Sequence, residues 1–228
     1  MTSVSSMQSS PQHQPSMNQP RARDLAEYQR DVKNLVATIR SIAIRTAEKS
    51  ASLEEFSAHF DGRLAALART QRILVRAGAF DIDLEEMVRE ELLAQAAREG
   101  VVVQGPSIRL SVKTAEALGL ALHELAVNAV KYGALSEPAG RLSVTWRLVN
   151  TNRGPRLSLE WRESGVRALD TQPSRSGFGR ELIERGLPFE LGATTALEFG
   201  RGGARALIEL PLTERIAELD EEQGSRSG

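Results

Sequence analysis

The sequence predicts an α+β protein, in which a two-helix hairpin is followed by a sandwich of a sheet and its helices. In the first part, apolar residues recur every three or four positions, which is the period of helices that pack on each other. Beyond residue 100, runs that alternate apolar and polar residues around short turns indicate strand hairpins, and a long apolar helix pattern lies among them. Hairpins with helices on one face give a two-layer sandwich. We therefore expect a disordered tail (1–23), the hairpin (24–78), the sandwich (79–212) and an acidic tail with a frayed helix (213–228).

The composition excludes several classes of function. Hydrophobic residues make up 41% of the 228 residues and charged residues 26%, as in ordinary soluble globular proteins. Since 29 Lys and Arg balance 30 Asp and Glu, no overall charge favours nucleic acid or an anionic membrane. No apolar run is long enough to span a bilayer, residues 1–20 lack the features of a secretory signal, and the chain has no cysteine. We expect a cytoplasmic protein that neither binds nucleic acid nor inserts into a membrane.

Two capped helices make up the predicted hairpin. Asp24 begins the first helix, and Ser52 with Glu55 forms a capping box that begins the second. Two antiparallel helices with one apolar seam each cannot bury those seams alone, so we expect a homodimer in which two chains form a four-helix bundle. The seam of the first helix consists of Leu25, Tyr28, Val32, Leu35, Ile39, Ile42 and Thr46.

Position 30 lies on the outer face of the first helix. If Leu25 is heptad position a, Arg30 falls at position f and points into solvent, with Asp31 beside it. Asn34 follows one turn later on roughly the same face. On an arbitrary helix, such residues mainly solvate the surface.

The helix pattern at residues 113–136 carries a polar stripe beside its apolar one. Glu124, Asn128 and Lys131 follow at i, i+4 and i+7, so they share a face. An acid, an amide and an ammonium suit Mg²⁺ and phosphate, although such a stripe alone is more often a solvated surface. Further on, Gly177 and Gly179 precede a helix whose free amide groups would favour an anion.

Short turns join the predicted strands. The stretch "VVVQGPSIRLSV" has the residues of strands interrupted by a Gly-Pro turn. The runs "RLSVTWRLVN" and "RLSLEW" flank "NTNRGP", and the runs "TALEF" and "ARALIELPL" flank "GRGG". Each of these two pairs predicts a hairpin.

These segments, in this order, resemble the HWE family of bacterial sensor histidine kinases over residues 24–212. The stretch "HELAVNAVKYGALS" is similar to the family's N box, "GFGRELIERGL" to its glycine-rich box and "EEFSAHFDGRLAALART" to its second dimerisation helix. The name-giving residues are His123, Trp161 and Glu163. The resemblance implies a dimerisation and phosphotransfer hairpin followed by a Bergerat (GHKL-type) α/β sandwich that binds ATP.

The resemblance also implies roles for the site residues. Asn128 would bind Mg²⁺, with Glu124 nearby to support the metal or to act as a general base, and Lys131 would contact phosphate. Glu163 and Gly165 would read the adenine amino group. Arg175 would reach the γ-phosphate, and the other nucleotide contacts would come from His123, Tyr132, Trp161, Gly177 and Gly179.

The phosphoryl acceptor departs from the family pattern. The family's first helix carries His-Arg-x-x-Asn, in which the histidine accepts phosphate, whereas the aligned residues here are Arg30, Asp31 and Asn34. A guanidinium stays protonated at neutral pH and offers no nucleophilic lone pair, whereas an imidazole does. We therefore expect no autophosphorylation at position 30. Val166 and Arg180 also differ from the family's usual residues.

Three functions fit these residues. The chain could bind Mg-ATP and act in trans on a partner's histidine in a mixed dimer with another histidine kinase, or regulate such a partner as a pseudo-kinase. Asp31 and Asn34 also reproduce a spacing that supports removal of phosphate from a response regulator's aspartate. The third function is a non-catalytic docking scaffold for a response regulator. His59, on the second helix, is interpreted as a surface or packing residue.

Overall fold

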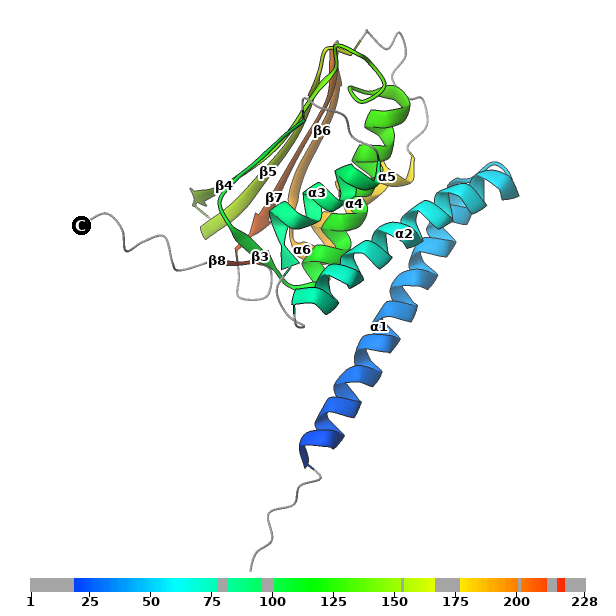
Figure 1. The fold of residues 1–228 in the computed structure, drawn as a ribbon, viewed down its shortest axis with the longest axis vertical. Helices are drawn as coiled ribbons and strands as arrows, with labels where there is room; N and C mark the ends of the chain where they lie inside the picture. The colour runs from blue at the N-terminus through cyan, green and yellow to red at the C-terminus, as the bar shows by residue number, and fades with distance from the viewer. Residues whose placement is uncertain are drawn as a thin grey trace, which may run out of the picture. The chain divides into compact units, whose positions relative to one another are not determined.

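The computed structural model describes residues 19–77, 82–95, 101–152, 154–166, 177–200, 202–212 and 217–219 (Figure 1). The chain divides into two compact units, residues 1–42 and residues 43–228. The first unit holds most of helix α1 (Gln19–Lys49), and the second holds its last turns and all other elements. No helix in the described ranges is long and apolar enough to cross a membrane. The domain boundaries expected from the sequence stay predictions.

The two N-terminal helices are α1 and α2 (Leu53–Ala77). Helix α1 begins at Gln19, before the Asp24 at which the sequence placed its start. The predicted capping box of α2 is confirmed, because the Ser52 hydroxyl accepts a hydrogen bond from the Glu55 amide at 3.1 Å. The Glu55 carboxylate in turn accepts from the Ala51 amide at 2.7 Å, one residue before the position that a capping box usually uses.

A five-stranded sheet forms the base of the second unit, in the order β2-β4-β5-β7-β6. Both predicted hairpins are confirmed: β4 pairs with β5, and β6 pairs with β7, each antiparallel. All neighbouring strands of this sheet are antiparallel except β2 and β4, which run parallel to each other. The strands are β2 (Val101–Gln104), β4 (Arg141–Thr151), β5 (Gly154–Ser164), β6 (Thr194–Gly200) and β7 (Gly203–Pro211).

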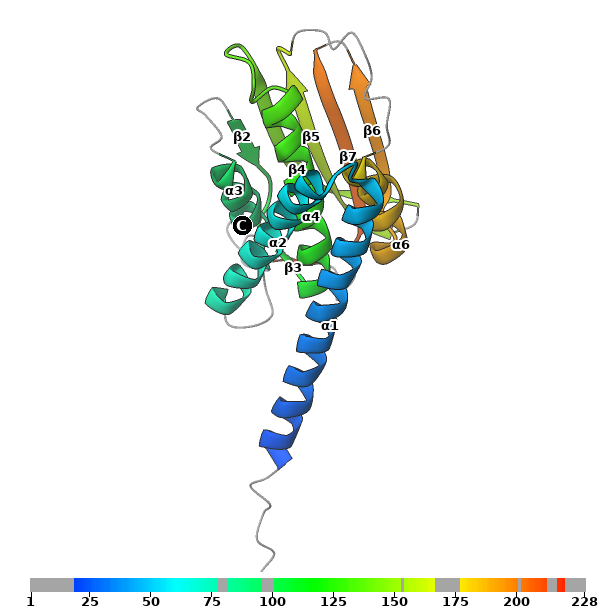
Figure 2. The same ribbon diagram turned by 90° about the vertical axis from the view of Figure 1, so that its right-hand side faces the viewer.

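Helices cover one face of this sheet, as Figures 1 and 2 show. The core lies between the two layers, and its fully buried side chains include Leu118 and Leu122 of α4 and Leu157, Leu159 and Trp161 of β5. The expected α+β sandwich is therefore confirmed. The covering helices are α3 (Leu84–Ala94), α4 (Val112–Tyr132), α5 (Phe178–Glu181), the π-helical segment η1 (Leu182–Gly186) and α6 (Leu187–Leu191).

A second, three-stranded antiparallel sheet joins β1 (Ile82–Asp83), β3 (Ile108–Leu110) and β8 (Ala217–Leu219). Strands β2 and β3 therefore enter different sheets, with the predicted Gly-Pro turn at residues 105–106 between them. The expectation of a frayed helix after residue 212 is wrong for residues 217–219. This segment pairs along β3, where backbone hydrogen bonds to a neighbouring strand replace those of a helix.

Candidate functional site

A cleft of about 1170 Å³ lies in the second unit, between α2 on one side and α4 with the glycine-rich segment on the other. The structure brings together in its walls most of the residues that the sequence singled out. Those that line it are His123, Glu124, Asn128, Lys131, Tyr132, Glu163, Gly177 and Gly179.

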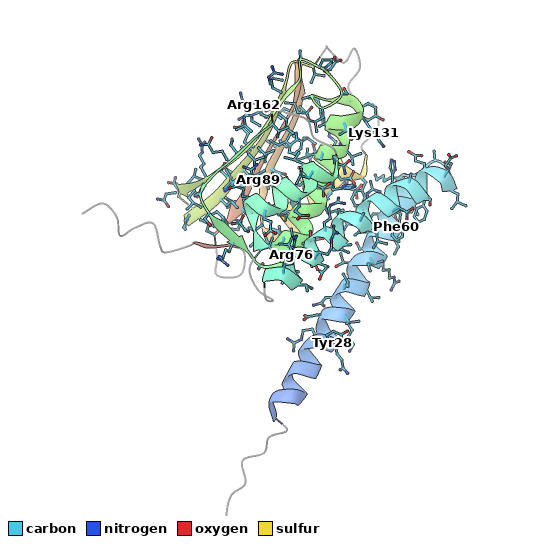
Figure 3. All side chains as sticks on the ribbon, viewed as in Figure 1. Tyr28, Phe60, Arg76, Arg89, Lys131 and Arg162 are labelled. Carbon is cyan, nitrogen blue, oxygen red and sulfur yellow. The ribbon has the colours of Figure 1, made fainter. Side chains whose placement is uncertain are left out.

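The polar stripe of α4 faces this cleft. Helix α4 starts after Ser111, whose hydroxyl accepts a hydrogen bond from the Thr114 amide at 3.4 Å. Asn128 and Lys131 are exposed to the cleft, and Figure 3 shows Lys131 near the C-terminal end of α4. The amide and the ammonium are therefore both accessible to an anionic ligand and its metal ion.

Glu163 is a buried carboxylate at the end of β5. Its Oε1 accepts a hydrogen bond from Trp161 Nε1 at 3.0 Å, and its Oε2 accepts from the Ala134 amide at 2.8 Å. Burial raises the pKa of Glu163, and these two hydrogen bonds oppose that effect. Trp161 is itself only 1% exposed, so it orients Glu163 from behind and does not line the cleft. A side chain at Gly133 would overlap Glu163 Oε2.

Glycines shape the backbone around the site. Gly165 has a φ of 76°, in the left-handed region, and a side chain there would overlap the Ala139 carbonyl. Gly179 lets α5 approach α4, since an added Cβ would lie 2.8 Å from Glu124 Cβ. Gly165 does not line the cleft, so its contribution is to the turn that follows Glu163.

His123 belongs to a relay of hydrogen bonds that links three helices. Its Nδ1 lies 2.8 Å from Oε1 of Glu91 on α3, and Oε2 of Glu91 accepts from Arg69 of α2 at 2.6 Å. A carboxylate can only accept, so Nδ1 carries the proton. Burial raises the pKa of Glu91, but hydrogen bonds and charge from His123 and Arg69 lower it by more. Behind His123 lies Gly62 of α2, whose Cβ, if present, would be 3.1 Å from His123 Nε2.

Arg63 of α2 is a site residue that the sequence reasoning missed. It is only 4% exposed, and its Nε and Nη2 donate to the two oxygens of Glu124 at 2.7 and 3.3 Å. The sequence carried no clear signal for it, because the apolar side of the second helix continues without a gap beside Arg63. That side consists of Leu53, Phe56, Phe60, Leu64, Leu67 and Leu74.

His59, one turn before Arg63, also lines the cleft. The sequence analysis interpreted it as a surface or packing residue, and in the structure it is half-buried in the wall of the cleft. Burial, followed by the nearby charges of Arg63 and Lys131, lowers the pKa of His59. Its imidazole is therefore neutral at neutral pH.

Other predicted residues belong to other parts of the chain. Arg30, Asp31 and Asn34 are exposed on α1, in the first unit. Arg175 lies outside the described residues. Within the described part of the chain, no three His, Asp or Glu side chains gather as metal ligands. A metal ion bound in the cleft would therefore take most of its coordinating oxygen atoms from an anionic molecule bound beside it and from water.

Comparison with known proteins places this geometry in a family. Residues 27–107 match the family model described as HWE histidine kinase. The chain is 30% identical over 187 residues to a blue-light-activated histidine kinase of Brucella ovis, covering 81% of this chain and 38% of that protein. It is 32% identical over 199 residues to blue-light-activated histidine kinase 1 of Erythrobacter litoralis, covering 83% and 53%.

The fold has a solved counterpart in the Erythrobacter litoralis EL346 blue-light activated histidine kinase, with a TM-score of 0.54 at 23% identity over 87% of this chain and 65% of that one. The likeness to this structure concerns the fold, helices followed by an α/β sandwich. The family model and the two relatives place the chain in the histidine kinase class. Within that class, the chain belongs to the HWE histidine kinase family. It spans only 38% and 53% of the two relatives named above.

Proposed function

We propose that this chain binds Mg-ATP in the cleft and works in two-component signalling without accepting phosphate on its own α1. It would act as a trans-acting kinase for a partner's histidine, or as a pseudo-kinase that regulates such a partner, with a response regulator downstream. One contrast carries the proposal. The cleft is lined by Asn128, Lys131 and Glu163, which suit a nucleotide, whereas the family's acceptor position holds the exposed guanidinium of Arg30.

The residues present fit a magnesium nucleotide. Asn128 offers an amide oxygen to Mg²⁺, which favours oxygen ligands and keeps several from phosphates and water. Lys131 supplies a cation for the phosphates, and Glu163 supplies a carboxylate that can accept a hydrogen bond from the adenine amino group. The bound magnesium would neutralise the charge that develops on the phosphates.

The test is phosphate incorporation from γ-labelled ATP with Mg²⁺, for the wild type and Arg30→His side by side. We expect acid-labile label only in Arg30→His, because an imidazole restores the missing nucleophile. The matched control is Arg30→His combined with Asn128→Ala, in which the acceptor is present but the metal ligand is lost and no label should appear.

Other outcomes separate the alternatives. Label in neither protein, with ATP still bound in a displacement assay, would favour response-regulator phosphatase or docking function through Asp31 and Asn34. If the wild type did not bind ATP at all, the proposal would be wrong. Acid-labile label in the wild type would contradict it and direct attention to His59.

A further inference from the structure

Arg63 connects α2 to both sides of the cleft. Beyond its two contacts with Glu124, its Nη1 donates to the Thr46 hydroxyl at 2.9 Å, and its guanidinium lies over the Phe178 ring at 3.8 Å from the ring centre. One side chain of α2 thus contacts the end of α1, the polar stripe of α4 and the first residue of α5. The Arg63–Glu124 pair is the central charged contact, with both side chains largely withdrawn from water.

The position of Arg63 along α2 divides the helix into two parts. Residues 53–62 are all exposed or half-buried, and Arg63 is the first buried residue of the helix. The later part is anchored by buried side chains, Ala66, Leu67, Thr70, Ile73 and Leu74. Arg63 is therefore the buried side chain nearest to the first ten residues of α2, whereas several buried side chains hold the later part of the helix.

The same contact involves a residue beside the proposed metal site. Glu124 lies one turn before Asn128 on the same face of α4. In the structure, both Glu124 oxygens accept from Arg63. A magnesium nucleotide bound at Asn128 would bring a divalent cation toward Glu124 and phosphate oxygens toward Arg63, so both partners would gain a competing ion of opposite charge.

We propose that Arg63 is a latch, which holds the first part of α2 against the cleft and is released when a magnesium nucleotide binds. The inference rests on the proposed binding of Mg-ATP and deepens it, because it gives a chain without its own acceptor a way to convert nucleotide binding into a change of the helical hairpin. A nearby ion pair between the end of α1 and α5 is more exposed to water than the Arg63–Glu124 pair. The Lys49–Glu181 ion pair spans 2.8 Å, but each side chain is about one third exposed and screened by water.

Hydrogen–deuterium exchange on the full chain tests this latch, with and without Mg²⁺ and a non-hydrolysable ATP analogue. We expect the amides of residues 53–63 to exchange about tenfold faster with the nucleotide, while those of residues 66–74 stay unchanged. In Arg63→Gln the first part should exchange fast already, and the nucleotide should add nothing. Glu124→Gln, which removes the partner charge and leaves Arg63 in place, should behave in the same way.

The matched control is Arg76→Gln on the same helix. Arg76 pairs with Glu90 at the surface at 2.9 Å, so its loss should leave the nucleotide response at the wild-type level. Slower or unchanged exchange of residues 53–63, in a sample whose bound nucleotide is confirmed by displacement of a fluorescent analogue, would overturn the latch and leave the proposed function standing. Absence of nucleotide binding in that assay would overturn both.

Discussion

Glu163 is held by two donors that come from different directions, one side chain and one backbone amide. The carboxylate can therefore turn little, and whatever it recognises in the cleft must approach along a fixed direction. Trp161 gives the family its second letter, yet in this structure its indole contributes through Glu163 and not through the cleft itself. The hydrogen bond from Trp161 to Glu163 therefore indicates what Trp161 does, which its place in a motif alone does not.

Replacing Trp161 by Phe should weaken nucleotide binding while the fold is kept. The phenyl ring still fills the core, but Glu163 loses the donor that orients it, and we expect about a tenfold loss of affinity, measured by isothermal calorimetry. Trp146→Phe is the matched control, because the Trp146 indole donates to the Pro106 carbonyl at 2.7 Å and lies outside the cleft. Equal losses in both variants would contradict the assignment.

At the scale of elements, the relay from Arg69 through Glu91 to His123 fastens α2, α3 and α4 together. All three side chains are largely buried, so removal of the central acid would leave two polar groups without their partner. This relay lies farther along α2 than Arg63, in the part of the helix that the core anchors.

Glu91→Gln should destabilise the protein by about 3 kcal/mol at neutral pH, measured by urea unfolding. The pKa of Glu91 lies below its ordinary value in the folded state, so its ionised form adds stability above that ordinary value, and this stability is lost as the pH falls through the folded pKa. The variant should therefore lose less stability than the wild type on acidification. Glu90→Gln, which removes a surface acid, is the control, and its cost should stay below about 1 kcal/mol.

The elements that the sequence predicted best are those whose signal is local. The hairpins β4–β5 and β6–β7 follow from alternation and short turns, and α4 follows from its two stripes. Helix α3 was missed although Asp83 is followed three residues later by Glu86, and the Asp83 carboxylate accepts from the Glu86 amide at 2.9 Å. That short capping signal stands before a helix of only 11 residues.

The contacts that the sequence did not predict depend on distant parts of the chain. Arg63 and Glu124 are separated by 61 residues, and no local pattern indicates that an arginine beside an apolar seam meets an acid on another helix. The same holds for Glu91 and His123, and for the pairing of β8 with β3. The placement of Asn128 and Lys131 along the cleft was foreseeable, because it requires only the helical period.

At the scale of the whole molecule, the first unit carries exposed apolar side chains along α1. Tyr28 is 67% exposed and Val32 is 42% exposed, and both belong to the seam predicted from the sequence; Figure 3 labels Tyr28. Large apolar side chains that repeat along one face of a helix mark a surface for a partner helix. This supports the proposed dimer of the hairpin.

Substituting both Tyr28 and Val32 by Lys should convert a dimer to a monomer, because two charges per chain would have to be buried in the seam. Sedimentation velocity would show the mass fall by half while the circular dichroism of the second unit is kept. Ala37→Lys, which adds one charge on the outer face of the same helix, should leave the dimer intact. A monomeric wild type at every accessible concentration would exclude the bundle.

The contact between Gly62 and His123 has a consequence for how such sequences diverge. A Cβ at position 62 would lie 3.1 Å from His123 Nε2, and Glu91 holds the imidazole from its other side. An alanine at position 62 would therefore require the imidazole to move by a few tenths of an ångström, and a larger side chain would require more. Among relatives, we expect larger residues at position 62 mainly where position 123 carries a side chain smaller than histidine.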